Sequence, residues 1–280
     1  MYRKIEKYFS GKLTSDGAGV KLHRVFGYYE IPEFDPFLMM DFFDSEDPND
    51  YIKGFPWHPH RGIETITYLI SGEIEHGDSL GNTGVIKDGD CQWMTAGSGI
   101  LHQEMPKESP KMLGTQIWLN LPRKNKMTEP KYRDITKDMI PVYEDDNMKV
   151  HIIAGEFKGL HGPLEVIETK PIFLDIELGP NREFIYDLDS SLKAFIFLVE
   201  GEANFNVNKE ELISSPKGVL YGEGSSIKIN TKDNKGRFFL LAGKPLNEPI
   251  AWGGPIVMNT KEELNLAFEE LDKGTFIKNK

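Results

Sequence analysis

Residues 54–105 read GFPWHPHRGIETITYLISGEIEHGDSLGNTGVIKDGDCQWMTAGSGILHQEM, a stretch in which short β-rich runs alternate with glycine, aspartate and proline. Its run from Glu64 to Ile70 has the length and the β-branched and aromatic content of a strand. Comparable runs follow at residues 114–121, 171–178, 194–199 and 237–241. Short strands at this spacing predict an all-β fold of antiparallel sandwiches or barrels.

The same stretch holds two pairs of residues that could bind metal, His58 with His60 and His102 with Glu104. Because side chains alternate between the faces of a strand, the two members of each pair point to the same side. A lone His-x-His is more often a solvated turn or a pair of satisfied core histidines, but the second pair favours a metal site. Three imidazoles and one carboxylate suit one divalent transition metal and leave positions open for a substrate.

Two further residues are candidates for a role around that site. If the strand register runs unbroken through the Arg61-Gly62 step, Glu64 faces the same cavity, as a rival ligand or as an acceptor that orients an imidazole. The residues alone do not choose between Glu64 and Glu104. His76 lies in EIEHGDSLGNTG, where a polar loop histidine and a residue behind the ligands or against the substrate are equally open.

A faint internal repeat divides the chain. Gly72-Glu73 recurs as Gly201-Glu202, an offset of 129 residues, and at this offset the second copy has no histidines in place of the first copy's. Residues 122–149 are rich in proline and charge and read as a connection without strands. We therefore predict an N-terminal metal-binding domain of residues 1–133 and a C-terminal domain of residues 134–280 without metal ligands.

One helix is predicted near the C-terminus. Thr260 and Glu263 form a T-x-x-E capping box, and Leu264, Phe268 and Leu271 supply one apolar stripe. We expect this short helix to pack against a β domain.

Composition limits the classes of function. The chain has 280 residues, a formal net charge of −11 and one cysteine, Cys91, so it has no intramolecular disulfide. The N-terminus lacks the apolar core of a secretion signal, and a cytoplasmic location is expected. No apolar run reaches the roughly 20 residues of a membrane span, and the acidic balance argues against direct binding of nucleic acid. A small molecule or a protein is the expected partner.

The block from HPHRG (58–62) to GILHQEMP (99–106) is highly specific, and DGAGVKLHRVFG (16–27), FDPFLMMDFF (34–43) and AGKPLNEPI (242–250) accompany it. With these motifs the chain resembles the pirin family of the bicupin superfamily over most of its length. The resemblance implies two antiparallel cupin β-barrels, with metal only in the N-terminal one.

The resemblance also implies a ligand set of His58, His60, His102 and Glu104, which favours Glu104 over Glu64. The implied cofactor is one divalent metal per chain, iron(II) first and other divalent transition metals as alternatives.

Two functions of different class are implied. The leading hypothesis is an enzyme that resembles quercetin 2,3-dioxygenase, which opens an aromatic flavonol substrate with O2 and releases carbon monoxide, with Glu104 as ligand and general base. The alternative is a non-enzymatic, iron-dependent regulatory protein that binds a transcription factor or a metabolic enzyme. Fold and ligands are common to both, so they do not decide between the two.

Overall fold

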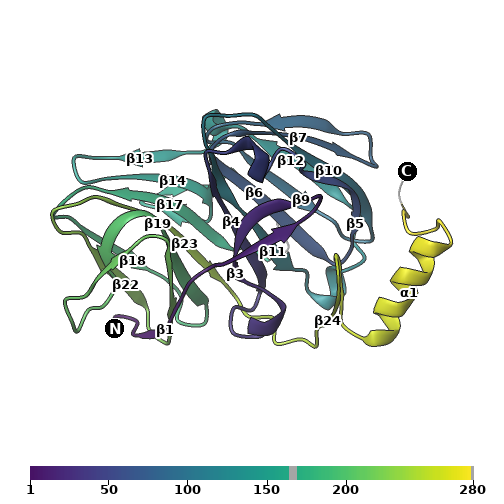
Figure 1. Cartoon of the computed structure of the whole chain (residues 1–280). Helices are drawn as coiled ribbons and strands as arrows, with labels where there is room; N and C mark the ends of the chain where they lie inside the picture. The colour runs from purple at the N-terminus through teal and green to yellow at the C-terminus, as the bar shows by residue number, and fades with distance from the viewer. Residues whose placement is uncertain (164–168, 279–280) are drawn as a thin grey trace. The chain divides into compact units, whose positions relative to one another are not determined.

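The computed structural model describes residues 1–163 and 169–278 (Figure 1). Its contacts divide the chain into two compact units, each built from two segments. The first unit joins residues 12–137 to residues 246–280, and the second joins residues 1–11 to residues 138–245. The all-β fold with one C-terminal α-helix is confirmed for the described residues. The predicted domains, 1–133 and 134–280, stay a prediction. The contact-based units differ from them in that each terminal segment groups with the opposite half of the chain.

The unit formed by residues 12–137 and 246–280 contains two antiparallel sheets. The seven-stranded sheet has the order β12-β9-β6-β11-β4-β3-β2, and the four-stranded sheet has the order β5-β10-β7-β8. The strands are β2 (Lys12–Asp16), β3 (Val20–Phe26), β4 (Phe37–Ser45), β5 (Phe55–His60), β6 (Ile63–Ser71), β7 (Glu73–Asp78), β8 (Thr83–Ile86), β9 (Cys91–Thr95), β10 (Ile100–Lys107), β11 (Met112–Asn120) and β12 (Lys131–Ile135). They form two open sheets with a cupin-like arrangement rather than one closed barrel.

The C-terminal segment completes this unit with a small hairpin, β24 (Ala251–Gly253) and β25 (Ile256–Met258), and with helix α1 (Lys261–Asp272). The predicted capping box is confirmed, since Thr260 accepts a hydrogen bond from the Glu263 amide and Glu263 bonds the Thr260 amide. The predicted apolar stripe needs one correction. Ala267 is fully buried, whereas Phe268 is 38% exposed. The helix packs against β24 and β25 through Ala267, with Leu264 and Leu271 partly buried beside it.

The unit formed by residues 1–11 and 138–245 repeats this topology. Its main path has the order β1-β21-β19-β23-β17-β14-β13, and β18, β22 and β20 extend the sheet from β19. The strands are β1 (Ile5–Phe9), β13 (Val142–Glu144), β14 (Met148–Ala154), β15 (Glu156–Phe157), β16 (Leu160–His161), β17 (Ile172–Leu178), β18 (Glu183–Asp187), β19 (Lys193–Asn204), β20 (Leu212–Ser214), β21 (Lys217–Tyr221), β22 (Ser226–Asn230) and β23 (Gly236–Gly243). Strand for strand, this order matches the first unit with β1 in the place of β12, which supports the internal repeat.

The interiors of the two units differ in chemistry. In the second unit, Phe184, Ile227, Ile229 and Phe238 belong to one buried apolar cluster. In the first unit, the even-numbered residues of β10 point inward and include His102 and Glu104, both buried. Apolar filling therefore occupies the space that ligands would need in the second unit, whereas the first unit keeps polar side chains inside.

The stretch 122–149, expected to be a connection without strands, contains β12 and β13. Strand β12 (KYRDI) pairs with β9 at an edge of its sheet, and four of its five residues remain at least partly exposed. Charged side chains on an edge strand conceal the apolar alternation on which strand prediction depends. Among the described residues, no helix is long and apolar enough to cross a membrane.

Candidate metal centre

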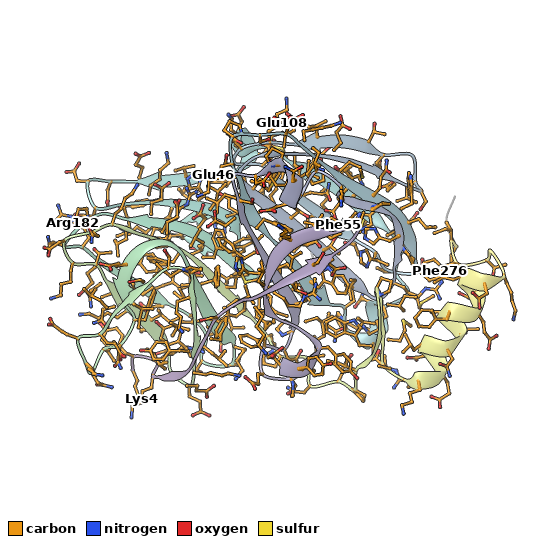
Figure 2. All side chains as sticks on the ribbon, viewed as in Figure 1. Lys4, Glu46, Phe55, Glu108, Arg182 and Phe276 are labelled. Atoms are coloured by element: carbon orange, nitrogen blue, oxygen red, sulfur yellow. The ribbon has the colours of Figure 1, made fainter. Side chains whose placement is uncertain are left out.

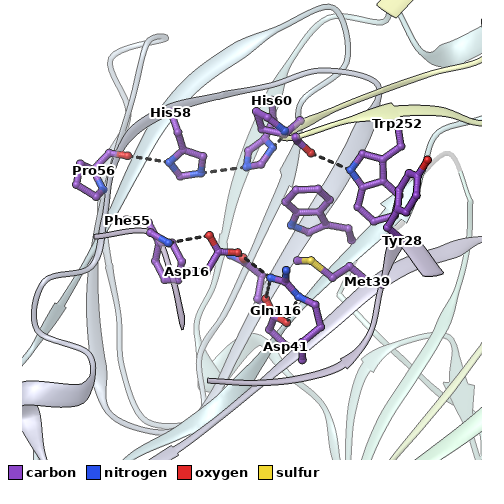
Figure 3. A pocket seen from close by; sticks show the side chains of 16 residues that line it. Asp16, Tyr28, Met39, Asp41, Phe55, Pro56, His58, His60, Gln116 and Trp252 are labelled. Carbon is purple, nitrogen blue, oxygen red and sulfur yellow. Dashed lines mark hydrogen bonds and ion pairs between the residues drawn. The ribbon is translucent and has the colours of Figure 1, made fainter. Parts of the chain in front are cut away.

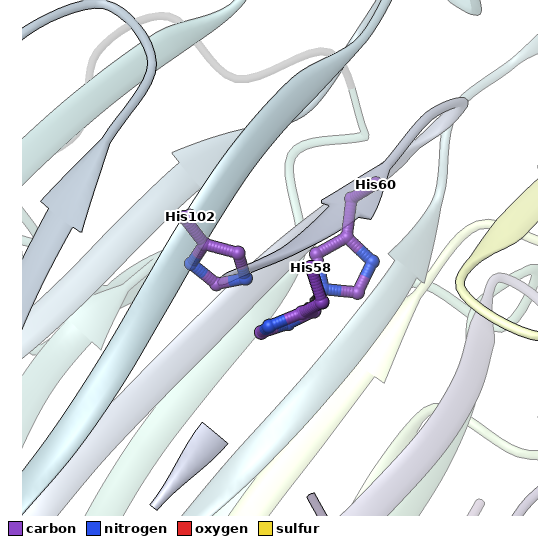
Figure 4. Close-up of side chains that lie close together, drawn as sticks. All are labelled: His58, His60 and His102. Atoms are coloured by element: carbon purple, nitrogen blue, oxygen red, sulfur yellow. Dashed lines mark hydrogen bonds between the residues drawn. The ribbon is translucent and has the colours of Figure 1, made fainter. Parts of the chain in front are cut away.

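Three histidines converge inside the unit that contains β5 and β10. One ring nitrogen each from His58, His60 and His102 forms a group whose members lie within 4.8 Å of one another (Figure 4). His58 and His60 come from β5, and the antiparallel pairing places His102 of β10 opposite His58. The two segments that the sequence analysis singled out, about 40 residues apart, are thus brought together as adjacent strands.

Hydrogen bonds fix the direction of two imidazoles. His58 Nδ1 lies 2.9 Å from the Pro56 carbonyl oxygen, and His60 Nδ1 lies 3.0 Å from the Pro255 carbonyl oxygen. A carbonyl only accepts, so each Nδ1 carries the hydrogen and each Nε2 keeps a lone pair. The two Nε2 atoms are 3.1 Å apart. Two lone pairs facing each other at this distance suit a cation between them.

The third imidazole is fully enclosed. His102 has no exposed surface, and neither of its ring nitrogens has a hydrogen-bond partner. Burial, reinforced by the neighbouring histidines, lowers the pKa of His102 well below its usual value, and burial followed by His58 lowers the pKa of His60 to about 3. Both imidazoles are therefore neutral at pH 7. Neutral, desolvated nitrogens without partners fit a transition metal, which accepts their lone pairs.

Glu104 lies two residues beyond His102 on the same face of β10. Its carboxylate accepts hydrogen bonds from Thr67 Oγ1 at 3.0 Å and from Gln116 Nε2 at 3.1 and 2.9 Å. These two donors hold the buried carboxylate in one orientation. The close group of ligand atoms contains the three histidines, so Glu104 as the fourth ligand stays a prediction.

Glu64 lies on the opposite face of β6 from Thr67, the residue that reaches Glu104. It is buried and accepts a hydrogen bond of 2.7 Å from Thr95 Oγ1. The change of face begins at Gly62, whose φ of +78° interrupts the extended chain between β5 and β6. Because of this interruption, the parity counted from His58 and His60 does not carry over to Glu64.

His76 is part of strand β7 and is buried, so a solvated loop histidine is the wrong description. It lies opposite Glu104 in the β10–β7 pairing. Its ring stacks on Tyr132 at 4.3 Å, and its centroid lies 5.5 Å from that of His102. Its Nε2 is 3.4 Å from Asp78 Oδ2. His76 thus packs behind His102, and a role in orienting that ligand stays a prediction.

A cavity of about 680 Å³ opens beside His58 and His60 (Figure 3). Trp118 forms one wall and contacts the His60 ring edge-on, with ring centroids 4.9 Å apart. Trp252 packs against Trp118, with centroids 5.7 Å apart, and Tyr28 packs against Trp252. The histidines therefore lie at the side of an aromatic-lined space that admits a small planar molecule.

Residues far along the chain anchor the strand that carries the first histidine pair. Arg61 is buried, forms a 2.7 Å ion pair with Glu270, donates to the Phe276 carbonyl oxygen at 2.8 Å and lies 4.1 Å from the Phe276 ring centre. Phe276 is labelled beside the C-terminal helix in Figure 2. The hairpin of β24 and β25 supplies Pro255, the partner of His60. The C-terminal segment thus fixes the orientation of this histidine.

A buried lysine, Lys126, connects the same elements. Its ammonium group donates to Asn120 Oδ1 at 2.6 Å, to the Gly62 carbonyl at 2.9 Å and to the Val257 carbonyl at 3.0 Å. Burial lowers the pKa of Lys126 to about 7, although Glu248 and Glu263 act in the opposite direction. Lys126 therefore joins the end of the histidine strand to β25.

The sequence analysis missed several of these residues. Asp41 and Gln116 line the cavity. Asp41 interrupts the apolar run FLMMDFF, and Gln116 stands at the start of QIWLNL, within the buried strand β11. A polar residue within a buried run is itself a signal, because it must find partners. Lys126 does not lie within a buried apolar run, since its neighbours Lys124 and Met127 are exposed. Its sequence context therefore gives no sign that it is buried.

The two buried glutamates give a first prediction. Replacing Glu104 by glutamine should weaken metal binding more than Glu64→Gln, because Glu104 shares the inward face of β10 with His102. Changes outside the ligand set typically reduce metal affinity by about 10- to 100-fold. Metal titration of both variants, with unfolding temperatures as a check on folding, measures the order. A larger loss for Glu64→Gln would show that the wrong carboxylate had been chosen.

Comparison with known proteins extends over both halves of the chain. Residues 19–119 match the pirin family, and residues 173–277 match the pirin C-terminal cupin domain. A pirin-like protein of Caulobacter vibrioides is 39% identical over 277 residues, which cover 98% of this chain and 99% of that protein. Pirin of Homo sapiens is 38% identical over 268 residues, which cover 95% of this chain and 91% of that protein.

The structural comparison agrees with these matches. A crystal structure of quercetin 2,3-dioxygenase from Acinetobacter baumannii superposes with a TM-score of 0.88 and 30% sequence identity, covering 99% of both chains. The likeness therefore extends well beyond the histidine motifs and includes both cupin units. The chain belongs to the pirin family.

Proposed function

We propose that this protein is an iron(II)-dependent dioxygenase that opens the ring of a flavonol such as quercetin. The observation that carries the proposal is the convergence of three imidazole nitrogens at the side of an aromatic-lined cavity. The name of the Acinetobacter baumannii relative, quercetin 2,3-dioxygenase, supports the same substrate class. We further propose one metal per chain and, since the one cysteine is a buried free thiol, a location in the cytoplasm.

The proposed ligands are His58, His60, His102 and Glu104. A bound iron(II) ion supplies Lewis acidity toward a flavonol hydroxyl group and redox chemistry with O2. In the proposed reaction, Glu104 takes the proton of that hydroxyl group on a carboxylate oxygen. Gln116 and Thr67 keep the carboxylate in place while it does so.

The aromatic walls have two roles in this proposal. Trp118 and Trp252 offer flat faces against which a planar ring system can pack, and they exclude water from the side of His60. Exclusion of water strengthens the electrostatic interactions within the cavity and limits side reactions of the activated substrate.

The decisive experiment is turnover of quercetin by protein reconstituted with iron(II), followed by O2 consumption and release of carbon monoxide. At equal metal occupancy, Glu104→Gln should lower turnover by at least about 100-fold, the usual contribution of a positioned base. Glu75→Gln is a matched control, because Glu75 is exposed and pairs with Lys107 on the neighbouring strand. We expect this control to retain full activity.

The alternative function, an iron-dependent regulatory protein, predicts the opposite result in the turnover experiment. Fully metallated protein would then turn over no flavonol, and its affinity for a protein partner would change with the oxidation state of iron. Slow turnover that Glu104→Gln leaves unchanged would indicate adventitious metal chemistry, and the catalytic role of Glu104 would be abandoned.

A further inference from the structure

An arginine between two aspartates lies in the wall of the cavity. The two aspartates, Asp16 and Asp41, are labelled below the histidines in Figure 3. Arg24 Nε and Nη2 donate to the two oxygens of Asp41 at 2.9 and 2.8 Å, and Nη2 also donates to Asp16 Oδ2 at 2.7 Å. Arg24 and Asp41 are cross-strand partners on β3 and β4, and Asp16 ends β2. We refer to Arg24, Asp41 and Asp16 together as the carboxylate wall.

The carboxylate wall has a net charge of −1, since one guanidinium faces two carboxylates. Asp41 is buried and both of its oxygens are held by Arg24, whereas the Asp16 side chain is about half exposed. Asp16 Oδ1 accepts from the Gly17 amide at 2.7 Å, and an ionised carboxylate has about four acceptor positions in all. Asp16 therefore retains acceptor capacity toward the cavity. A hydroxyl group of a ligand can donate a hydrogen bond to one of these acceptor positions, whereas a carboxylate of a ligand is repelled by the net negative charge.

The turn that carries Asp16 packs against an aromatic ring. Asp16 precedes Gly17, which has a φ of +56°, and a Cβ atom at that glycine would lie 2.6 Å from the Phe55 ring. The Phe55 ring thus packs directly on the turn that carries the carboxylate. Because Arg24 and the Gly17 amide already hold the Asp16 carboxylate, its side chain loses little conformational freedom when a ligand binds, and this favours tight binding.

The carboxylate wall and the histidines belong to one cavity, which His58, His60, Gln116 and Asp16 all line. Asp41 lies opposite Arg24 on one side and Gln116 on the other, so one row of the sheet crosses β3, β4 and β11. Gln116 holds Glu104 at one end of this row, and Arg24 holds Asp16 at the other. A ligand with one end at the histidines therefore shares its space with Asp16.

We propose that Asp16, held by Arg24, selects flavonols that carry hydroxyl groups on the pendant ring, the ring remote from the metal centre. The inference rests on the proposed function and specifies its substrate. The pendant-ring hydroxyl donates its hydrogen to Asp16, and a pendant ring bearing a carboxylate is rejected by the net charge of the carboxylate wall.

Binding without turnover tests this selectivity. Metal-loaded protein is titrated under exclusion of O2 with quercetin, which has two pendant hydroxyl groups, with galangin, which has none, and with 3-hydroxyflavone-4′-carboxylate. Asp16→Asn should weaken the binding of quercetin about 10-fold, because a charge-assisted hydrogen bond is lost. The affinity for galangin should stay within about twofold, and the affinity for the carboxylate probe should increase. Asp44→Asn is the matched control, since Asp44 pairs with Lys111 outside the cavity and should change none of the three affinities.

The outcomes separate this inference from the proposed function. If quercetin binds with the expected preference but is not turned over under O2, the dioxygenase proposal fails and Asp16 keeps its role. If quercetin is turned over, either of two results overturns selection by Asp16. One is an equal loss of quercetin and galangin affinity in Asp16→Asn, and the other is no rise in the KM or Kd for quercetin in that variant. Absence of binding by any flavonol to metal-loaded protein overturns both.

Discussion

Metal binding is expected to disappear when His58 and His60 are both replaced by alanine. The double variant removes two of the three converging nitrogens, including the Nε2 pair that lies 3.1 Å apart. Changes outside the ligand set alone reduce affinity by about 10- to 100-fold, so loss of two direct ligands should exceed about 1,000-fold. Elemental analysis after dialysis and competition with a chelator measure the content and the affinity.

The matched control removes the same number of imidazoles elsewhere. His151 and His161 both lie in the unit formed by residues 1–11 and 138–245, outside the histidine group. The His151→Ala, His161→Ala double variant should keep one metal per chain. Unchanged metal content in the His58→Ala, His60→Ala protein, or two tightly bound transition metals in the unaltered chain, would refute the assignment of the site.

Replacing Lys126 by methionine should destabilise the fold by about 3 kcal/mol or more. The change leaves Asn120 Oδ1 and two carbonyl oxygens without their shared donor, and each buried acceptor left unsatisfied costs about 1–3 kcal/mol. Denaturant unfolding at pH 7 measures the loss. Lys124→Met is the matched control, because Lys124 belongs to the same turn but is exposed, and its replacement should stay within about 0.5 kcal/mol.

The same lysine predicts the direction of a pH effect. Its pKa of about 7 in the folded chain lies below the unfolded value of 10.5, so folding releases a proton between these two pH values. The free energy of unfolding attributable to Lys126 should therefore rise as pH rises from about 7 to 10.5, by up to about 5 kcal/mol, and stay level below pH 7. The difference between the unaltered protein and Lys126→Met isolates this contribution. A difference that stays constant from pH 7 to pH 10 would contradict it.

Within single strands, the two-residue spacing is a reliable guide to which side chains share a face. His58 and His60 both lie on β5, and His102 and Glu104 share the inward face of β10, because alternation is a local property of an extended chain. Their role as metal ligands stays a prediction. The same rule failed at Glu64, since the positive φ of Gly62 interrupts the extended chain before β6 begins. Parity arguments hold only as far as the backbone stays extended.

Contacts between distant segments were beyond such local rules. The partner of His60 is Pro255, 195 residues further along the chain, and no periodicity connects the two. Strand β12 was missed because its charged residues lie at the edge of a sheet, where exposure removes the apolar pattern. Asp16 was missed because an aspartate before a glycine reads as an ordinary turn residue.

The exchange of terminal segments between the two units has a consequence for synthesis on the ribosome. When residues 12–137 have emerged, the unit that holds the histidines still lacks residues 246–280, which are translated more than 100 residues later. Until then, His60 has no Pro255 carbonyl to orient its ring, and Lys126 has no Val257 carbonyl to bind. A nascent chain therefore presents its histidines before their surroundings exist, and the oriented centre can form only after translation has reached the final hairpin. If the proposed metal is bound, its loading into the oriented centre is therefore a step of maturation that follows synthesis of residues 251–258.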